Sequence, residues 1–185
     1  MVSLTLNDKD NTRRALEIAI DEAVRLSAPL LVATTFGATA VEALRMAQAR
    51  GIADRLFIIT HVYGSRGPGV NAMLEEHRKV LTDAKANLIT AAHALSGAER
   101  ALSTRFSGAY PVEIIAHTLR MFSQGVKVAV EIGAMALDAG AIPYGAPVVA
   151  VGGTGHGADT VTVLTPAYTQ DIFSTKIHEL LCKPY

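Results

Sequence analysis

Short apolar runs alternate with amphipathic segments along most of this chain. Between residues 11 and 26, apolar side chains such as Leu16, Ile20 and Ala23 recur at spacings of three and four, which indicates one face of a helix. Residues 30–34 form a continuous apolar run instead, which is typical of a buried strand. The same reasoning predicts strands at 30–34, 56–60, 126–132, 147–153 and 160–166, and a weaker strand from 87 into a loop at 93–97. Helices are predicted at 11–26, 38–50, 72–84, 111–124 and 133–138, with Gly51 and Gly125 ending the second and the fourth of them.

This alternation of strands and helices predicts an α/β fold, a three-layer α/β/α sandwich with a mostly parallel sheet. The strands at 147–153 and 160–166 are joined only by a loop, so they are expected to form an antiparallel closing hairpin. Segment 99–108 is expected to be irregular, and 177–182 to be a strand or a helix. Residues 1–185 contain no repeat or clear linker, and we expect a single domain.

The composition excludes several classes of protein. Half of the 185 residues are hydrophobic but only 5% are aromatic, so the core must consist of Ala, Val, Ile and Leu. Acidic and basic residues balance at 17 each and form no basic run, so nucleic acid is not an expected partner. Because no apolar run approaches the roughly 18 residues of a membrane span and no leader pattern opens the chain, we expect a cytoplasmic protein without membrane contact.

Small and polar residues follow nearly every predicted strand. The carboxyl ends of parallel strands meet at one edge of a sheet, and ligands of open α/β sheets bind outside that edge. We therefore expect a binding site where these strand exits converge. The exits place there Thr34, Thr35, Phe36, Gly37, Ala38, Thr39, His61, Tyr63, Glu131, Gly152, Gly153, Thr154, Gly155, His156 and Gly157.

The first exit, 34–39, is the best candidate for a phosphate site. The N–H groups of the helical turn that begins at Ala38 lack intrahelical partners and carry the positive end of the helix dipole. Thr34, Thr35 and Thr39 add hydroxyl groups, and Gly37 allows a ligand to approach the backbone closely. An ordinary βα turn without a ligand remains the alternative.

The loop at 152–160 is the second candidate, because its glycines can present several N–H donors to an anion. A strand follows this loop where a dinucleotide-binding motif requires a helix, so a nicotinamide cofactor is not expected. A flexible hairpin loop is the alternative.

Other reactive side chains give weaker signals. His61, His93, Glu131 and His156 lie at strand exits, but their spacing matches no metal-binding motif, and no metal is assigned. Glu99 and Arg100 are interpreted as a solvated charge pair, and the lone Cys182 as a buried structural thiol.

The chain also resembles a known family. The segment TTFGATA (34–40) resembles the phosphate loop of the pyruvate kinase C-terminal domain, and 148–163 looks like the closing hairpin of that domain. Nearly the whole chain is similar to stand-alone pyruvate-kinase-C-terminal-like (pyruvate kinase alpha/beta domain) proteins of archaea and bacteria, whose function is uncharacterised. The matching motifs are HALSGAER (93–100), KVAVEIGAMALDAGAIP (127–143) and VVAVGGTGHGADT (148–160).

The resemblance implies a three-layer fold and no kinase activity, since the catalytic barrel of pyruvate kinase is missing. Flavin mononucleotide (FMN) is associated with some members. By analogy, the 35–39 loop would hold the FMN phosphate, while His61, Glu131 and 152–157 would face the ribityl chain and the ring. The chain departs from pyruvate kinases in having no Trp for effector contacts, and its nearby aromatic residues are limited to Phe36, Tyr63, Phe106 and Tyr110.

Three functions follow as hypotheses. The first is a protein that binds a phosphorylated small molecule, specifically a flavoprotein that binds FMN. The second is an enzyme acting on a phosphorylated metabolite, with His61 or His93 as acid/base and Glu131 as its partner. The third is a sugar-phosphate-sensing module that signals through a homo-oligomer; Ala40, Ala43 and Ala47 permit close helix packing, either inside the domain or between subunits.

Overall fold

A computed structural model describes residues 1–4 and 11–185. Residues 5–10, part of the opening segment for which no leader pattern is expected, lie outside the described residues. The strands are β1 (Val2–Leu4), β2 (Leu30–Thr34), β3 (Leu56–Thr60), β4 (Asn87–Thr90), β5 (Val148–Gly152), β6 (Thr160–Thr165) and β7 (Lys176–Pro184). The helices are α1 (Asn11–Leu26), α2 (Ala38–Ala49), α3 (Glu75–Asp83), α4 (Glu99–Phe106), α5 (Pro111–Arg120) and α6 (Gln124–Asp138), with 3₁₀ turns at Ala53–Arg55 and Thr169–Ser174.

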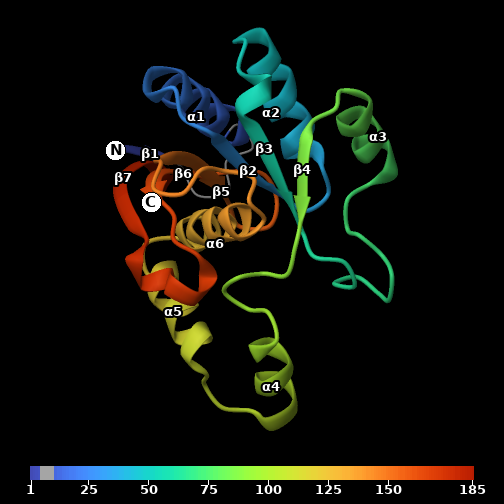
Figure 1. Ribbon diagram of the computed structural model, residues 1–185, viewed down its shortest axis with the longest axis vertical. Coiled ribbons are helices and arrows are strands. Elements are labelled where there is room, and N and C mark those ends of the chain that lie inside the picture. Colours follow the sequence, from blue (N-terminus) through green and yellow to red (C-terminus); the bar gives the residue numbers. More distant parts are fainter. Residues whose placement is uncertain (5–10) are drawn as a thin grey trace.

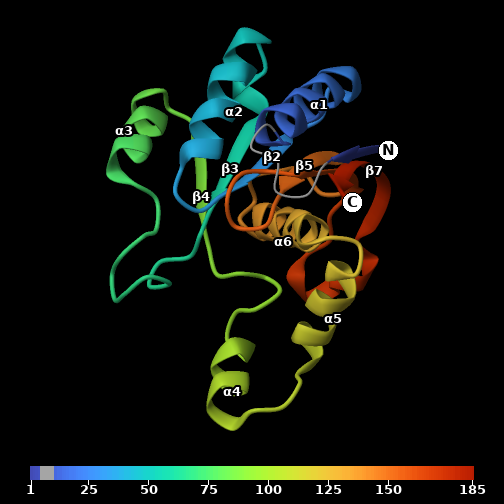
Figure 2. The ribbon, with the colours of Figure 1, turned by 180° about the vertical axis from the view of Figure 1, so that it is seen from behind.

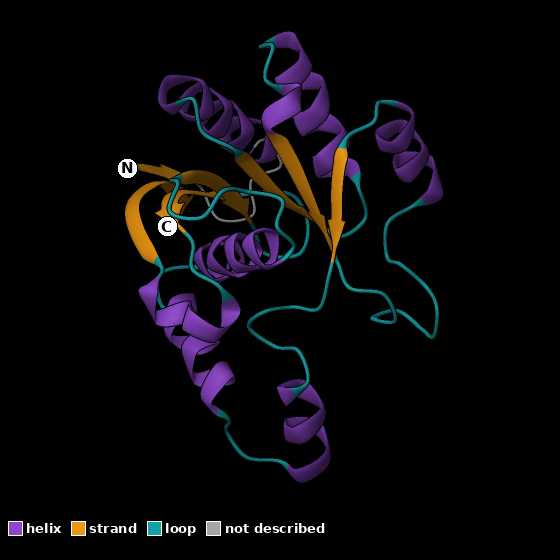
Figure 3. Ribbon diagram, viewed as in Figure 1, coloured by secondary structure: helices purple, strands orange, loops and turns teal. Residues whose placement is uncertain are grey.

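The protein is an α/β fold built on one mixed, mostly parallel sheet of seven described strands in the order β1-β7-β6-β5-β2-β3-β4 (Figure 3). β2 pairs in parallel with both β3 and β5, and β3 pairs in parallel with β4. β6 is antiparallel to β5 and to β7, which confirms the predicted closing hairpin. The carboxyl ends of β2, β3, β4 and β5 consequently lie at the same edge of the sheet.

Helices cover both faces of the sheet. Figures 1 and 2 show α1, α2 and α3 on one side and α5 and α6 on the other. Alternation along β2 divides the core between these layers: Leu30 and Val32 pack with α1 and α2, whereas Leu31 packs with α6. Each face has its own apolar cluster, as expected for a sheet buried on both sides.

One prediction was wrong in a way that matters for the site. Residues 126–132 are not a strand, and 133–138 are not a separate helix, because both belong to the single helix α6. Ser123 caps this helix by accepting a hydrogen bond from Val126 N–H at 3.0 Å, so Gly125 lies in its first turn and does not end α5. Nearly all of α6 is buried, and a helix that is apolar on all sides cannot be distinguished from a buried strand by periodicity.

The segment expected to be irregular, 99–108, contains α4 instead. No residue of this helix is buried, and Figures 1 and 2 show it projecting beyond α5 and away from the sheet. It is tied to α5 by side chains: Glu99 accepts a hydrogen bond from Glu113 N–H at 3.1 Å, and Ser103 Oγ donates to Glu113 Oε1 at 2.7 Å. Glu99 therefore caps α5 and does not form the predicted charge pair with Arg100.

The observed bounds of α3, β7 and β1 differ from the predicted elements in smaller ways. The third helix begins at Glu75, three residues later than predicted, and 176–184 resolves to strand β7. The short strand β1, which had not been predicted, pairs in parallel with β7, and this brings the two ends of the chain together.

The alanine stripe of α2 and the lone cysteine are both buried. Ala40, Ala43 and Ala47 are fully buried against the sheet, so this alanine stripe serves packing within the chain. Cys182 is buried as predicted, and burial raises the pKa of its thiol to about 11. Among the described residues, no helix is long and apolar enough to cross a membrane.

Candidate functional site

A cavity of about 790 Å³ lies at the carboxyl edge of the parallel strands. Its wall combines the β2–α2 turn, the exits of β3 and β4, one face of α6 and the glycine-rich loop between β5 and β6. A volume of this size lies within the range of small-molecule and cofactor sites. The convergence of strand exits predicted from the sequence is therefore present as a cavity.

The β2–α2 turn presents an open helix N-terminus to this cavity. Gly37 precedes α2 with a left-handed φ of +101°, and Thr34 Oγ1 accepts a hydrogen bond from its N–H at 3.1 Å. The cap residue Gly37 has no side chain to bond the first turn of α2, which leaves the N–H donors after it for an anion. The hydroxyl-bearing residues Thr35 and Thr39 line the cavity beside them.

Packing from α3 fixes the conformation of this turn. Phe36 carbonyl accepts hydrogen bonds from Leu74 N–H at 3.1 Å and from His77 Nδ1 at 2.8 Å. A carbonyl can only accept, so His77 carries a proton on Nδ1. A Cβ atom at residue 37 would lie 2.5 Å from His77 Cβ, and glycine is required there by space as well as by φ.

The glycine-rich loop closes another side of the cavity. Gly153, Gly155, His156 and Gly157 line it, and the His156 ring stacks on the Phe36 ring with centroids 5.8 Å apart. The loop is anchored to α1, where Thr12 Oγ1 accepts a hydrogen bond from the N–H of residue 158 at 2.9 Å. This contact holds the loop beside the β2–α2 turn.

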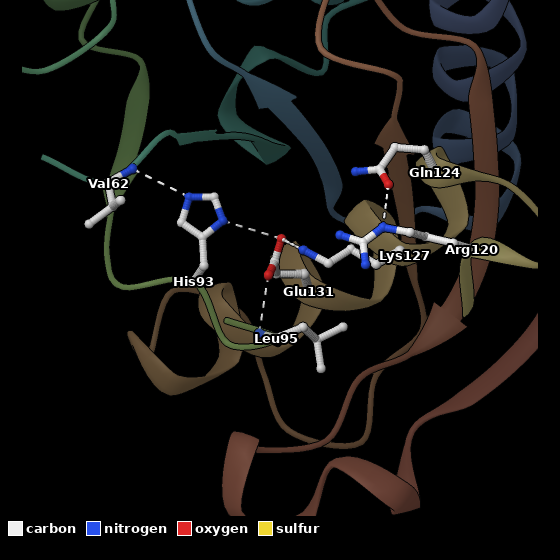
Figure 4. Close-up of polar contacts among 7 residues, drawn as sticks. All are labelled: Val62, His93, Leu95, Arg120, Gln124, Lys127 and Glu131. Carbon is white, nitrogen blue, oxygen red and sulfur yellow. Dashed lines mark hydrogen bonds and ion pairs between the residues drawn. The ribbon is translucent and has the colours of Figure 1, made fainter. Parts of the chain in front are cut away.

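A buried charged cluster forms the wall contributed by α6 and the β4 exit (Figure 4). Glu131 Oε2 lies 2.5 Å from Lys127 Nζ and 3.3 Å from His93 Nδ1, and Glu131 Oε1 accepts a hydrogen bond from Leu95 N–H at 3.1 Å. His93 Nε2 in turn accepts a long hydrogen bond, 3.5 Å, from Val62 N–H. The two contacts of His93 are satisfied together by the neutral tautomer protonated at Nδ1.

Burial and neighbouring charges shift the pKa values of Glu131 and Lys127 in opposite directions. Burial alone would raise the pKa of Glu131, but the hydrogen bond from His93 and the charge of Lys127 lower it to about 2. Burial lowers the pKa of the Lys127 ammonium, because the attraction of Glu131 only partly compensates for lost hydration. Glu131 is therefore an ionised carboxylate, and Lys127 is an amine that gives up its proton more readily than a surface lysine.

His61 lies against this cluster at the exit of β3. Its ring centroid is 4.4 Å from that of His93, as expected for exits of neighbouring parallel strands. Burial, followed by the proximity of His93, lowers the pKa of His61. Its Nδ1 atom is buried with no hydrogen-bond partner among the described residues.

Most residues predicted for the site line the cavity. These are Thr34, Thr35, Phe36, Gly37, Ala38, Thr39, His61, Glu131, Gly153, Gly155, His156 and Gly157. Three others do not. Tyr63 is 53% exposed and outside the wall, Thr154 donates its hydroxyl to Asp159, and Gly152 ends β5 against the backbone of Gly125.

Several residues of the wall were not predicted, and the most important is Lys127. It was assigned to a strand, where residues four apart share a face but lie about 13 Å from one another. On a helix the same spacing brings the Cβ atoms to within about 6 Å, so recognition of α6 would have revealed the pair. Gln124 was likewise not predicted. Ser96 and Gly97 belong to the loop predicted at 93–97, and Arg100, which was interpreted as one member of a solvated charge pair, also lines the wall.

No family model matches the chain. The resemblance to stand-alone pyruvate-kinase-C-terminal-like proteins stays a prediction. Among the described residues, no group of three or more His, Cys, Asp or Glu side chains is arranged to hold a metal ion.

Proposed function

We propose that this protein binds a small phosphorylated molecule at the carboxyl edge of its sheet, and that this molecule is FMN. The observation that carries the proposal is the uncapped N-terminus of α2, which opens into the cavity together with Thr35 and Thr39. Charge-assisted hydrogen bonds from such donors to a phosphate contribute about 1.5–3 kcal/mol each. We propose no kinase activity, in keeping with the resemblance to the pyruvate kinase C-terminal domain.

Two features support a flavin as the remainder of the ligand. The rings of Phe36 and His156 border the cavity and offer apolar surface to a planar heterocycle. The same cavity is lined by His61, His93 and Glu131, whose hydrogen-bonding groups can contact the polar edge of a ring or a ribityl chain.

The test begins with the absorption spectrum of freshly purified protein, followed by titration of the apoprotein with FMN, riboflavin and inorganic phosphate. FMN should bind and quench its fluorescence, riboflavin should bind far more weakly because it lacks the phosphate, and phosphate should compete with FMN. Equal binding of FMN and riboflavin would reject the phosphate turn as the anchor. Binding of phosphate without any flavin binding would retain the anion site and exclude FMN.

An enzyme acting on a phosphorylated metabolite is the second candidate, and the contact between His93 and Glu131 favours it. A carboxylate that fixes the tautomer of a histidine beside a ligand cavity is a recurrent arrangement for proton transfer. Turnover of a phosphorylated metabolite that varies with pH through the histidine range would support this candidate.

A further inference from the structure

The wall of the cavity that contains the proposed phosphate anchor also contains an unusual amine. Lys127 lines the cavity although its side chain is only 6% exposed, and it belongs to the buried helix α6. The exposed pair Lys79–Asp83 on α3 has the same spacing of four residues, but its lysine side chain is 72% exposed. A buried lysine is expensive to keep charged, and its location in a cavity gives it access to a ligand.

The neighbours of Lys127 suit it to react as a nucleophile. An ammonium must lose a proton before its nitrogen can attack, and Glu131 Oε2 lies 2.5 Å away as an acceptor. Glu131 is held in place by hydrogen bonds from Leu95 N–H and His93 Nδ1–H, so its carboxylate stays directed at the amine. Burial also lowers the pKa of Lys127, in the direction that activates an amine.

We propose that Lys127 forms a Schiff base with a phosphorylated aldehyde or ketone whose phosphate binds at the β2–α2 turn. This inference rests on the proposed phosphate site and adds the substrate class and the reacting group. The Nζ lone pair forms a bond to the carbonyl carbon, and the C=O π electrons move to the oxygen. That oxygen then leaves as water.

The protons of this step balance without an added reagent. A lysine ammonium and a carbonyl yield a protonated imine and one water, so two of the three ammonium protons leave with the oxygen. Glu131 relays the first of them from the ammonium to the carbinolamine oxygen, and the second passes from the carbinolamine nitrogen to the same oxygen. The nitrogen lone pair then forms the C=N bond as the C–O bond breaks and water leaves. No oxidant, reductant or metal takes part.

Borohydride trapping tests the inference on the full chain. The protein is incubated with dihydroxyacetone phosphate, reduced with sodium borohydride, and analysed by intact mass and peptide mapping. We expect a single reduced adduct on Lys127, suppressed by excess inorganic phosphate and formed much less with unphosphorylated dihydroxyacetone. An adduct spread over exposed lysines, or no adduct, would overturn the inference.

Matched variants sharpen this result. Lys127→Arg keeps the positive charge opposite Glu131 but removes the amine, so the adduct should disappear. Lys79→Arg changes a lysine with the same spacing to its carboxylate on an exposed helix, and the adduct should remain. Peptide mapping of the wild-type protein locates the adduct without either variant, so the test does not depend on whether the variants fold.

The two proposals can fail separately. Absence of trapping in a protein that still binds FMN or phosphate would overturn the Schiff base and leave the phosphate site intact. Equal trapping of the phosphorylated and unphosphorylated ketones on Lys127 would support the reactive amine and overturn the phosphate anchor.

Discussion

Lys127 Nζ lies 2.5 Å from Glu131 Oε2, one turn apart on α6, and both side chains are almost completely buried. Such a pair makes a reliable contribution to stability only when further hydrogen bonds satisfy both groups. Here Leu95 N–H and His93 Nδ1–H donate further hydrogen bonds to the carboxylate of Glu131. The pair thus joins α6 to the loop after β4 across the cavity wall.

Replacing Glu131 by Gln should destabilise the protein by about 3–5 kcal/mol at pH 7, because Lys127 would be left as an uncompensated buried charge. The comparison is the exposed pair Lys79–Asp83, where Asp83→Asn should cost less than about 1 kcal/mol. Urea denaturation of the three proteins measures both values. Similar costs for the two variants would contradict the importance of burial.

The same carboxylate should make stability depend on pH. The pKa of Glu131 falls from an ordinary 4.5 to about 2 on folding, so its ionised form contributes about 3 kcal/mol, present above pH 4.5. This contribution is lost as the pH falls from 4.5 through 2. The stability difference between wild type and Glu131→Gln should therefore shrink across this window in acid denaturation series. A constant difference would argue against a depressed pKa.

Thr39→Asp should abolish binding of FMN or phosphate, because it places a negative charge where the anion is expected. Thr39 is only 8% exposed, but an acidic residue in the first turn of a helix is favourable, so the variant should remain folded. Thr39→Ser retains the hydroxyl group and should bind within a few-fold of wild type. Fluorescence titration measures the affinity of the three proteins for FMN. Unchanged affinity in Thr39→Asp would show that the β2–α2 turn is not part of the site.

Gly37→Ala should be more damaging than Gly51→Ala. Both glycines have positive φ, so each substitution carries a cost of about 1–2 kcal/mol for the left-handed backbone. Only at residue 37 would the new Cβ collide with His77, whereas nothing lies within 4 Å at residue 51. The difference between the two free energies of unfolding measures the collision, and equal values would show that α3 yields easily.

Gly125→Ala should destabilise the protein even though residue 125 is helical. Alanine in a helix is normally favoured over glycine by about 1 kcal/mol. At this position, however, a Cβ would overlap the Thr160 side chain, while at Gly133 it would lie 3.1 Å from Leu164 Cδ1. We expect a loss of stability at 125 and a smaller effect at 133 in thermal denaturation. A gain at 125 would mean that β6 can move away from α6.

Local sequence was sufficient for much of the parallel half of the sheet. The run at 30–34, the glycine at 37 and the periodic segment beyond it were predicted with the bounds observed for β2 and the start of α2. Each of these signals is local, because strands, tight turns and amphipathic helices have different periods or turn residues. The cavity at the strand exits followed from the parallel topology.

Helices α4 and α6 show where local patterns were insufficient. α6 is apolar on nearly every side because it lies between the sheet and α5, and periodicity disappears when every face of a helix is buried. α4 is the opposite case, with no buried residue, and it is held by side-chain hydrogen bonds to Glu113. Both errors concern a tertiary environment that is invisible in the sequence.

The sequence by itself determined the α/β class, the closing hairpin and the edge of the sheet where the cavity and the β2–α2 turn lie, because these depend on local periods and on chain connectivity. Only the tertiary structure decided that Lys127, Glu131 and His93 form one buried cluster on that edge. The reason is physical: a turn is specified by residues adjacent in sequence, whereas the cluster joins α6 to the loop after β4. Burial shifts the pKa values of Lys127 and Glu131, and this burial exists only after the chain has folded.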